Sequence, residues 1–181
     1  MNYERLEKNI TDNIKEAQIK LGFENRPMSF NYMLGSLNHL IGENLDSDSM
    51  KTALENFVVN TRERLGEITF RPIKDGFCIT VSAEGTAYVN GLDGFEFITE
   101  FVNTVRNHGV SLDDVMEVFR KYSDNIIAEK KENGEFDWLV YFADRIPDEY
   151  LYCIALEEEI DGHIHVMYHR FIREDYEEFN F

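Results

Sequence analysis

Apolar residues recur at steps of three or four over much of the N-terminal half of the chain. Residues 3–21 carry one narrow apolar stripe on an otherwise polar helix, which Gly22 can end. The stripe is broader in the segment 46–65, where acidic residues and serines begin the helix and Gly66 follows it. We expect two long helices here, and residues 1–22 could form a helical arm packed on the rest.

The stretch "RPMSFNYMLGSLNHLIG" between these helices is apolar but has no clean period. Pro27 disfavours helical backbone at the residue before it, and Gly35 could interrupt a helix further on. We expect an irregular or short extended piece here, followed by a short helix that carries Leu37, Leu40 and Ile41.

Apolar and polar residues then alternate in "ITFRPIKDGFCITVS", a pattern typical of a β-hairpin. A two-residue turn at Asp75-Gly76 would place Phe70 opposite Val81 and Pro72 opposite Ile79. Because proline removes a donor from the hydrogen-bond ladder, this strand is expected at a sheet edge. The following "TAYVN" is a candidate third strand.

The second half of the chain again has helical patterns followed by strand patterns. The spacing predicts one helix over 95–105 and another that Ser111 and Asp114 cap. Over 123–132 the helical spacing could continue, but "SDN" is a breaker cluster, so we favour a strand over 126–132 paired with "FDWLVYFA". Since aromatic residues occupy both faces of "FDWLVYFA", we expect a central strand that is covered on both sides.

A last hairpin is expected over 150–171, around Asp161-Gly162, and "REDYEEF" predicts a short terminal helix that buries Tyr176 and Phe179. This order of helices and strands predicts an α+β fold. We expect a single domain over residues 1–181, with N-terminal helices, a mainly antiparallel sheet built from hairpins, and a short C-terminal helix. Four residues at the centres of apolar patterns are expected in one core: Phe57, Phe101, Phe119 and Leu139.

The charge of the chain narrows the classes of partner. Its 35 Asp and Glu residues outnumber its 18 Lys and Arg residues, for a formal net charge of −17. Such a surface repels phosphate backbones and anionic lipids, so neither nucleic acid nor a membrane is expected as a partner. The acidic excess can serve solubility alone, or it can attract a basic protein surface or cations. The oligomeric state stays open.

The two cysteines do not suggest a reactive site. Cys78 and Cys153 lie in the apolar runs "FCITV" and "YCIAL", which is typical of buried structural thiols. Two separate cysteines, no apolar leader in "MNYERLEKNI" and no run of about 18 apolar residues together predict a cytoplasmic protein. Motifs for dinucleotide, phosphate-loop, serine-hydrolase and structural zinc sites are absent from the sequence. We therefore assign no catalytic residue and no cofactor.

One stretch, "EEEIDGHIHVMYHR" at 157–170, has the residue types of a metal site. The expected turn would pair Glu158 with His165, and alternation along the strand puts His163, His165 and His169 on one face. His165 and His169 start about 13 Å apart, too far to share an ion, whereas His163 and His165 start about 6.6 Å apart. Glu158, His163 and His165 are thus the candidate metal ligands. The interpretation we favour is instead a solvated hairpin tip without a metal.

The stretches "RPMSFNYMLGSLNHLIG", "PDEYLYCIA" and "YHRFIREDYEEF" resemble a domain-of-unknown-function family of acidic proteins from anaerobic Firmicutes. The resemblance covers nearly the whole chain and implies a small bacterial cytoplasmic protein, with no known activity or site residue. The function we expect is a non-enzymatic acidic binding or interaction protein with a basic protein partner. The alternative is a small metal-dependent enzyme with its site at the 157–170 hairpin, where a further Asp or Glu would act as general base.

Overall fold

The structure, a computed structural model, describes every residue of the chain except 133, 146–149, 159–161, 163 and 180–181. The chain divides into two compact units, Met1–Gly94 (unit 1) and Phe95–Phe181 (unit 2). Over the described residues there are seven helices and two sheets, both antiparallel. The predicted α+β class, the N-terminal helices and the short C-terminal helix are therefore confirmed. Whether the chain is a single domain stays a prediction.

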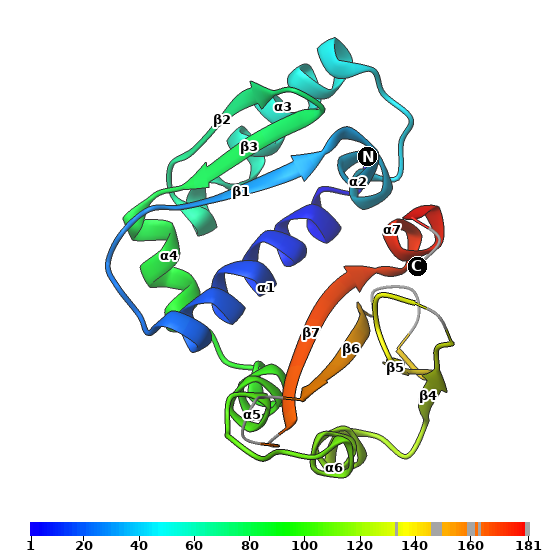
Figure 1. The fold of residues 1–181 in the computed structure, drawn as a ribbon. Helices are drawn as coiled ribbons and strands as arrows, with labels where there is room; N and C mark the ends of the chain where they lie inside the picture. Colours follow the sequence, from blue (N-terminus) through cyan, green and yellow to red (C-terminus); the bar gives the residue numbers. More distant parts are fainter. Residues whose placement is uncertain (133, 146–149, 159–161, 163, 180–181) are drawn as a thin grey trace. The chain divides into compact units, whose positions relative to one another are not determined.

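Unit 1 combines four helices with a three-stranded sheet (Figure 1). The strands run in the order β1-β3-β2, so β3 is central and β2, which contains Pro72, lies at an edge as predicted. The elements of unit 1 are α1 (Tyr3–Leu21), β1 (Met28–Met33), α2 (Leu34–Ile41), α3 (Ser47–Leu65), β2 (Ile68–Ile73), β3 (Gly76–Val81) and α4 (Ala83–Asn90).

The third strand of this sheet is β1, and the prediction of a strand at "TAYVN" is wrong, because residues 86–90 belong to α4. Two local features favour the helix. The Ser82 side chain accepts a hydrogen bond from the Gly85 backbone N–H, which caps the helix start. A Cβ atom on Gly85 would lie 2.1 Å from the carbonyl oxygen of Leu65, so glycine lets α4 pack directly on the end of α3.

The predicted register of the β2–β3 hairpin is also wrong. Phe70 pairs with Ile79 and Pro72 pairs with Phe77, so the turn falls at Lys74-Asp75 and Gly76 is the first residue of β3. Gly76 is needed for close approach and not for the turn, because a Cβ atom there would lie 1.9 Å from the carbonyl oxygen of Tyr32 in β1. Each β2 residue pairs two positions away from its predicted partner on β3. Because the shift is an even number of residues, every side chain still points to the predicted face of the sheet.

Unit 2 has a four-stranded sheet in the order β4-β5-β6-β7. The predicted strand after residue 125 is confirmed, and α6 ends because the Ser123 hydroxyl accepts from the Asn125 N–H and donates to the Asp144 carboxylate. The capping box of Ser111 and Asp114 is also confirmed. The elements of unit 2 are α5 (Glu96–Val105), α6 (Leu112–Tyr122), β4 (Ile126–Lys130), β5 (Trp138–Phe142), β6 (Tyr150–Glu158), β7 (Ile164–Ile172) and α7 (Arg173–Phe179).

One face of this second sheet packs against α5 and α6 through aromatic rings. The ring centroids of Phe97 and Phe142 are 4.9 Å apart, those of Phe97 and Phe119 5.0 Å, and those of Phe101 and Tyr152 5.0 Å. Most of these pairs meet edge to face, the geometry that aromatic quadrupoles favour. We call this side of the sheet the helical face.

The prediction that four residues share one core is wrong, although all four are buried. Phe57 belongs to the core of unit 1. Phe101 and Phe119 lie on the helical face of the sheet in unit 2, whereas Leu139 points to the opposite face and packs with Leu151 and Cys153. The alternation of β5 separates these residues, because Leu139 precedes Val140, which shares the helical face with Phe142.

None of the helices in the described parts of the chain combines the length and the apolar composition that crossing a bilayer requires.

The close contact at Gly76 generates a stability prediction. Gly76→Ala should cost about 1–3 kcal/mol, because the added methyl group forces β1 and β3 apart. The matched control is Gly91→Ala, where the nearest atom to a new Cβ lies 3.5 Å away and the change should stay within about 0.5 kcal/mol. Urea denaturation followed by circular dichroism measures both, and equal midpoints for the two variants would contradict the assignment of Gly76 to the strand.

Candidate functional site

The hairpin that holds the candidate metal ligands pairs in a register one residue away from the prediction. His165 lies opposite Glu157, and Glu158 lies opposite Ile164. Since neighbouring residues of a strand point to opposite faces, His165 and Glu158 project from opposite sides of the sheet. His163 is outside the described residues, so the three predicted ligands cannot be compared as a set.

Nothing else in the described parts of the chain takes the place of that set. Among those residues, no group of three His, Cys, Asp or Glu side chains is arranged to hold a metal ion. His169, which was rejected on distance, lies opposite Cys153, with its ring 5.5 Å from that of Phe136. The metal-dependent enzyme therefore stays a hypothesis, and no arrangement of the described residues supports it.

The face of the sheet opposite to the helical face holds the feature that sequence reasoning missed. Its floor is a small apolar cluster of Leu139, Leu151 and Cys153, which are at most 5% exposed. This side is covered by α7 and by residues 131–132 and 134–136 between β4 and β5, and we call it the α7 face. The side chains packed on the cluster are Phe136, Tyr141, Phe171 and Tyr176.

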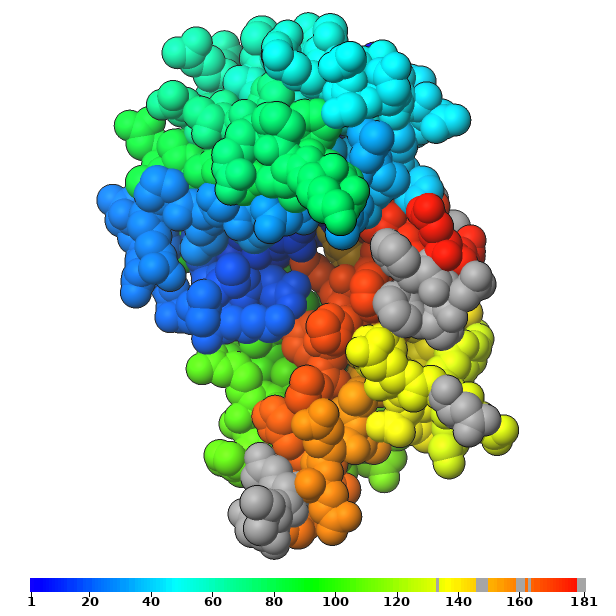
Figure 2. Space-filling model, turned by 45° about the horizontal axis from the view of Figure 1, so that its top comes forward, coloured from blue at the N-terminus to red at the C-terminus, as the bar shows by residue number. Residues whose placement is uncertain are grey.

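Phe136, which precedes β5, reaches β7. Its ring lies 6.4 Å from that of Phe171, and Figure 2 shows the yellow surface of the β4–β5 region beside the orange-red surface of β7. The carboxylate of Asp137 accepts a hydrogen bond from the Leu156 N–H at 2.7 Å, which fixes the start of β5 against β6. Two separate pieces of chain therefore cover the α7 face: the described residues between β4 and β5, and α7.

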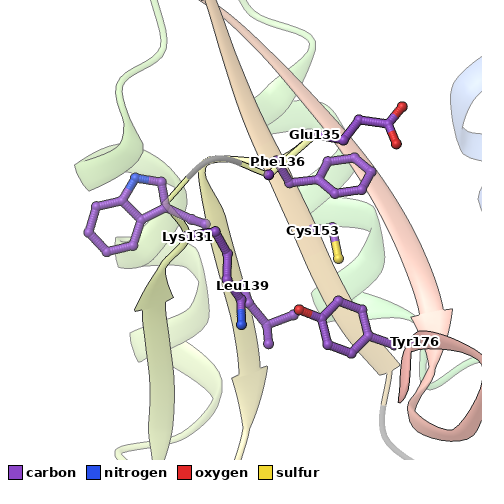
Figure 3. A pocket seen from close by; sticks show the side chains of 8 residues that line it. Lys131, Glu135, Phe136, Leu139, Cys153 and Tyr176 are labelled. Atoms are coloured by element: carbon purple, nitrogen blue, oxygen red, sulfur yellow. The ribbon is translucent and has the colours of Figure 1, made fainter. Parts of the chain in front are cut away.

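A pocket lies where the two covering pieces meet (Figure 3). Tyr176 comes from α7, Cys153 from β6, and Lys131 from the end of β4, and their side chains converge on it. Its free space is about 10 Å³, enough for the centre of one water molecule. The lining residues are Lys131, Gly134, Glu135, Phe136, Trp138, Leu139, Cys153 and Tyr176.

Cys153, predicted to be a buried thiol, is fully buried at the base of this pocket. Burial raises the pKa of its thiol from an ordinary value of 9.0 to about 11, and the nearby Lys131 charge only partly opposes this. The thiol is therefore protonated at neutral pH. A protonated, enclosed thiol is neither a nucleophile nor a metal ligand.

Lys131 is held as a cation. Its ammonium lies 5.7 Å from the centroid of the Tyr176 ring and 3.3 Å from the Glu129 carboxylate. The pKa of Lys131 is raised mainly by a hydrogen bond with the Tyr176 side chain. Burial lowers this pKa, and the Glu129 carboxylate raises it further. A charged ammonium cannot act as an amine nucleophile. The pocket thus places apolar side chains, the Lys131 charge and Glu135 around the space of about one water molecule, and neither Cys153 nor Lys131 is in a nucleophilic form there.

The negative charge of the chain is concentrated in unit 2. Unit 2 holds 21 of the 35 acidic residues and 8 of the 18 basic residues, a formal net charge of −13. Unit 1 holds the other 14 acidic and 10 basic residues, a formal net charge of −4. Many of the unit 2 carboxylates lie on exposed residues: Glu117, Asp124, Glu129, Glu132, Glu135, Asp137, Asp144, Glu157, Glu158, Glu177 and Glu178. Several of these belong to the two pieces that cover the α7 face.

Comparison with known proteins gives one match. Residues 3–180 match the model of a family described as "Domain of unknown function, E. rectale Gene description (DUF3877)". No curated protein and no solved structure matches the chain.

Burial of Cys153 generates a prediction for alkaline pH. The pKa of the thiol is near 9.0 when it is exposed and about 11 when it is folded, so the unfolded state loses its proton first. Stability should therefore fall between about pH 9 and pH 11, by at most roughly 2–3 kcal/mol from this group. In Cys153→Ala this part of the loss should disappear, whereas the control Cys78→Ala should keep it. Urea denaturation at pH 8, 9, 10 and 11 measures the difference, and equal pH slopes for the two variants would refute the assignment.

Proposed function

Since the chain belongs to DUF3877, a family of unknown function, we propose its role from its own charges: it is a non-enzymatic protein whose acidic unit 2 binds a basic protein partner. The observation that carries the proposal is the uneven charge, −13 in unit 2 against −4 in unit 1. A charge that served solubility alone would have no reason to gather on one unit.

The sign and the setting of the charge favour a protein partner. Nucleic acid and anionic membranes would be repelled by this unit, because both bind through cationic side chains. A basic protein surface would be attracted over about a Debye length, which speeds the encounter.

The setting proposed for this interaction is the bacterial cytoplasm. The family is named after E. rectale, a Firmicutes anaerobe, which supports a bacterial origin. Both cysteines are buried and free, which suits a reducing compartment. Two of the titratable groups in the pocket, Cys153 and Lys131, are held in unreactive protonation states, which supports a binding role over a catalytic one.

The proposal predicts a salt-dependent association that depends on unit 2. The partner is captured from a bacterial lysate with the intact protein, identified by mass spectrometry, and expected to carry an excess of Lys and Arg. Its association rate should fall several-fold between about 50 and 500 mM salt, with a smaller change in the dissociation rate.

Matched variants locate the interaction. Glu132→Gln, Glu135→Gln and Glu158→Gln together remove three exposed charges from unit 2 and should slow association at low salt by about three- to tenfold. The control removes three exposed charges from unit 1, at Glu55, Glu63 and Glu67, and should change the rate less than about twofold. Equal effects of the two sets, or a rate independent of salt, would contradict the proposal.

A further inference from the structure

We propose that α7 is a displaceable cover: it leaves the α7 face as one piece while the rest of unit 2 stays folded, and its departure exposes the apolar cluster of Leu139, Leu151 and Cys153. This inference goes beyond the proposed function and does not depend on it. It rests on how α7 is built, on what holds it, and on what lies beneath it.

By itself α7 is a poor helix. It spans seven residues, Arg173–Phe179, about two turns, whereas isolated helices need about 12–15 residues to be even marginally stable in water. Four of the seven residues are acidic, and they stand at the spacings that bring like charges together on a helix, such as Glu174 with Glu178 and Asp175 with Glu178. Glu174 and Asp175 lie in the first turn, where the helix dipole favours negative charge, but Glu177 and Glu178 lie at the other end, where the dipole disfavours it. The helix therefore depends on its docking.

The docking on the sheet includes contacts of Tyr176 and Arg173. Tyr176 packs on the apolar cluster and interacts with the Lys131 ammonium, and the guanidinium of Arg173 lies 4.9 Å from the centroid of the Tyr141 ring. The side chain of Phe179, predicted to be buried with Tyr176, is outside the described residues. Of the two predicted contacts, Tyr176 alone is thus observed, and it is partly buried.

On the opposite side of the same sheet, the covering helices are longer than α7 and are bound to each other. The two helices there, α5 and α6, have 10 and 11 residues, and rings from both pack edge to face into the sheet. The α5 and α6 helices are also tied to each other, because the Tyr122 hydroxyl donates to the Glu100 carboxylate, which also pairs with Lys121. Sub-global opening begins at elements with little structure of their own, and among the three helices in the described part of unit 2 α7 is the shortest.

Removal of α7 would uncover an apolar surface. Cys153 is 0% exposed and Leu151 1% exposed beneath this cover, with the rings of Tyr141 and Phe171 beside them. The same opening would bring the Cys153 thiol into contact with water, so the rate at which this thiol is modified reports how often α7 leaves.

The test measures the rate at which Ellman's reagent modifies Cys153 in the full chain, with Cys78→Ala as background so that a single thiol reacts. The rate is followed at increasing urea concentration below the unfolding transition. A local opening exposes little surface, so its rate should rise only shallowly with urea, whereas global unfolding gives the steep slope seen by circular dichroism.

Variants give the second arm of the test. Tyr176→Ala should raise the modification rate at least tenfold and leave the urea midpoint of the whole unit nearly unchanged. Tyr176→Phe keeps the ring and should raise the rate less than about threefold. Tyr88→Ala, which removes a tyrosine that is 45% exposed on α4, is the matched control and should leave the rate as it was.

Three results would overturn the proposal. The first is a modification rate whose urea dependence equals that of global unfolding in the parent protein. The second is an unchanged rate in Tyr176→Ala. The third is a Tyr176→Ala protein that fails to fold, because a cover that can leave is not required for the fold.

Discussion

Strand β6 is apolar on both of its faces, and the structure of unit 2 follows from the need to cover both. Tyr152 and Ile154 point to one side, and Leu151 and Cys153 to the other, and all four are at most 2% exposed. An antiparallel sheet commonly leaves one face to water, but β6 does not allow this without exposing apolar side chains. The sheet is therefore enclosed by two helices on one side and by α7 with residues 131–132 and 134–136 on the other.

The two enclosures are built differently, and that difference connects the fold to the proposed function. The helical face is closed by interlocked aromatic rings from two helices, one of which begins with a capping box. The α7 face is closed by segments rich in carboxylates, which are poor at covering apolar surface and good at attracting cations. The acidic charge that we propose to attract a basic partner thus lies partly on the cover that we propose to leave. A partner that engaged both the charge and the uncovered surface would combine fast association with apolar contact.

Sequence patterns predicted the elements better than the contacts between them. The helices at 47–65 and 112–122 follow from their caps and apolar stripes, because those signals are local. The turn at Asp75-Gly76 was misplaced because Gly76 serves a contact with Tyr32, more than 40 residues away, which no local pattern encodes. The register of β6 with β7 was likewise off by one residue, which moved Glu158 away from His165. The pocket has no sequence signal, since Lys131, Cys153 and Tyr176 come from three separate elements.

Hydrogen–deuterium exchange of the intact protein tests the unequal closure of the two faces most directly. Peptides from α7 should exchange orders of magnitude faster than peptides from β6, and the α7 rate should respond only weakly to low concentrations of urea. Peptides from α5 and α6 should exchange at the same rate as peptides from β6, since the helical face opens only when the unit unfolds. Exchange of α7 and β6 at one common rate, with one common urea dependence, would contradict the account.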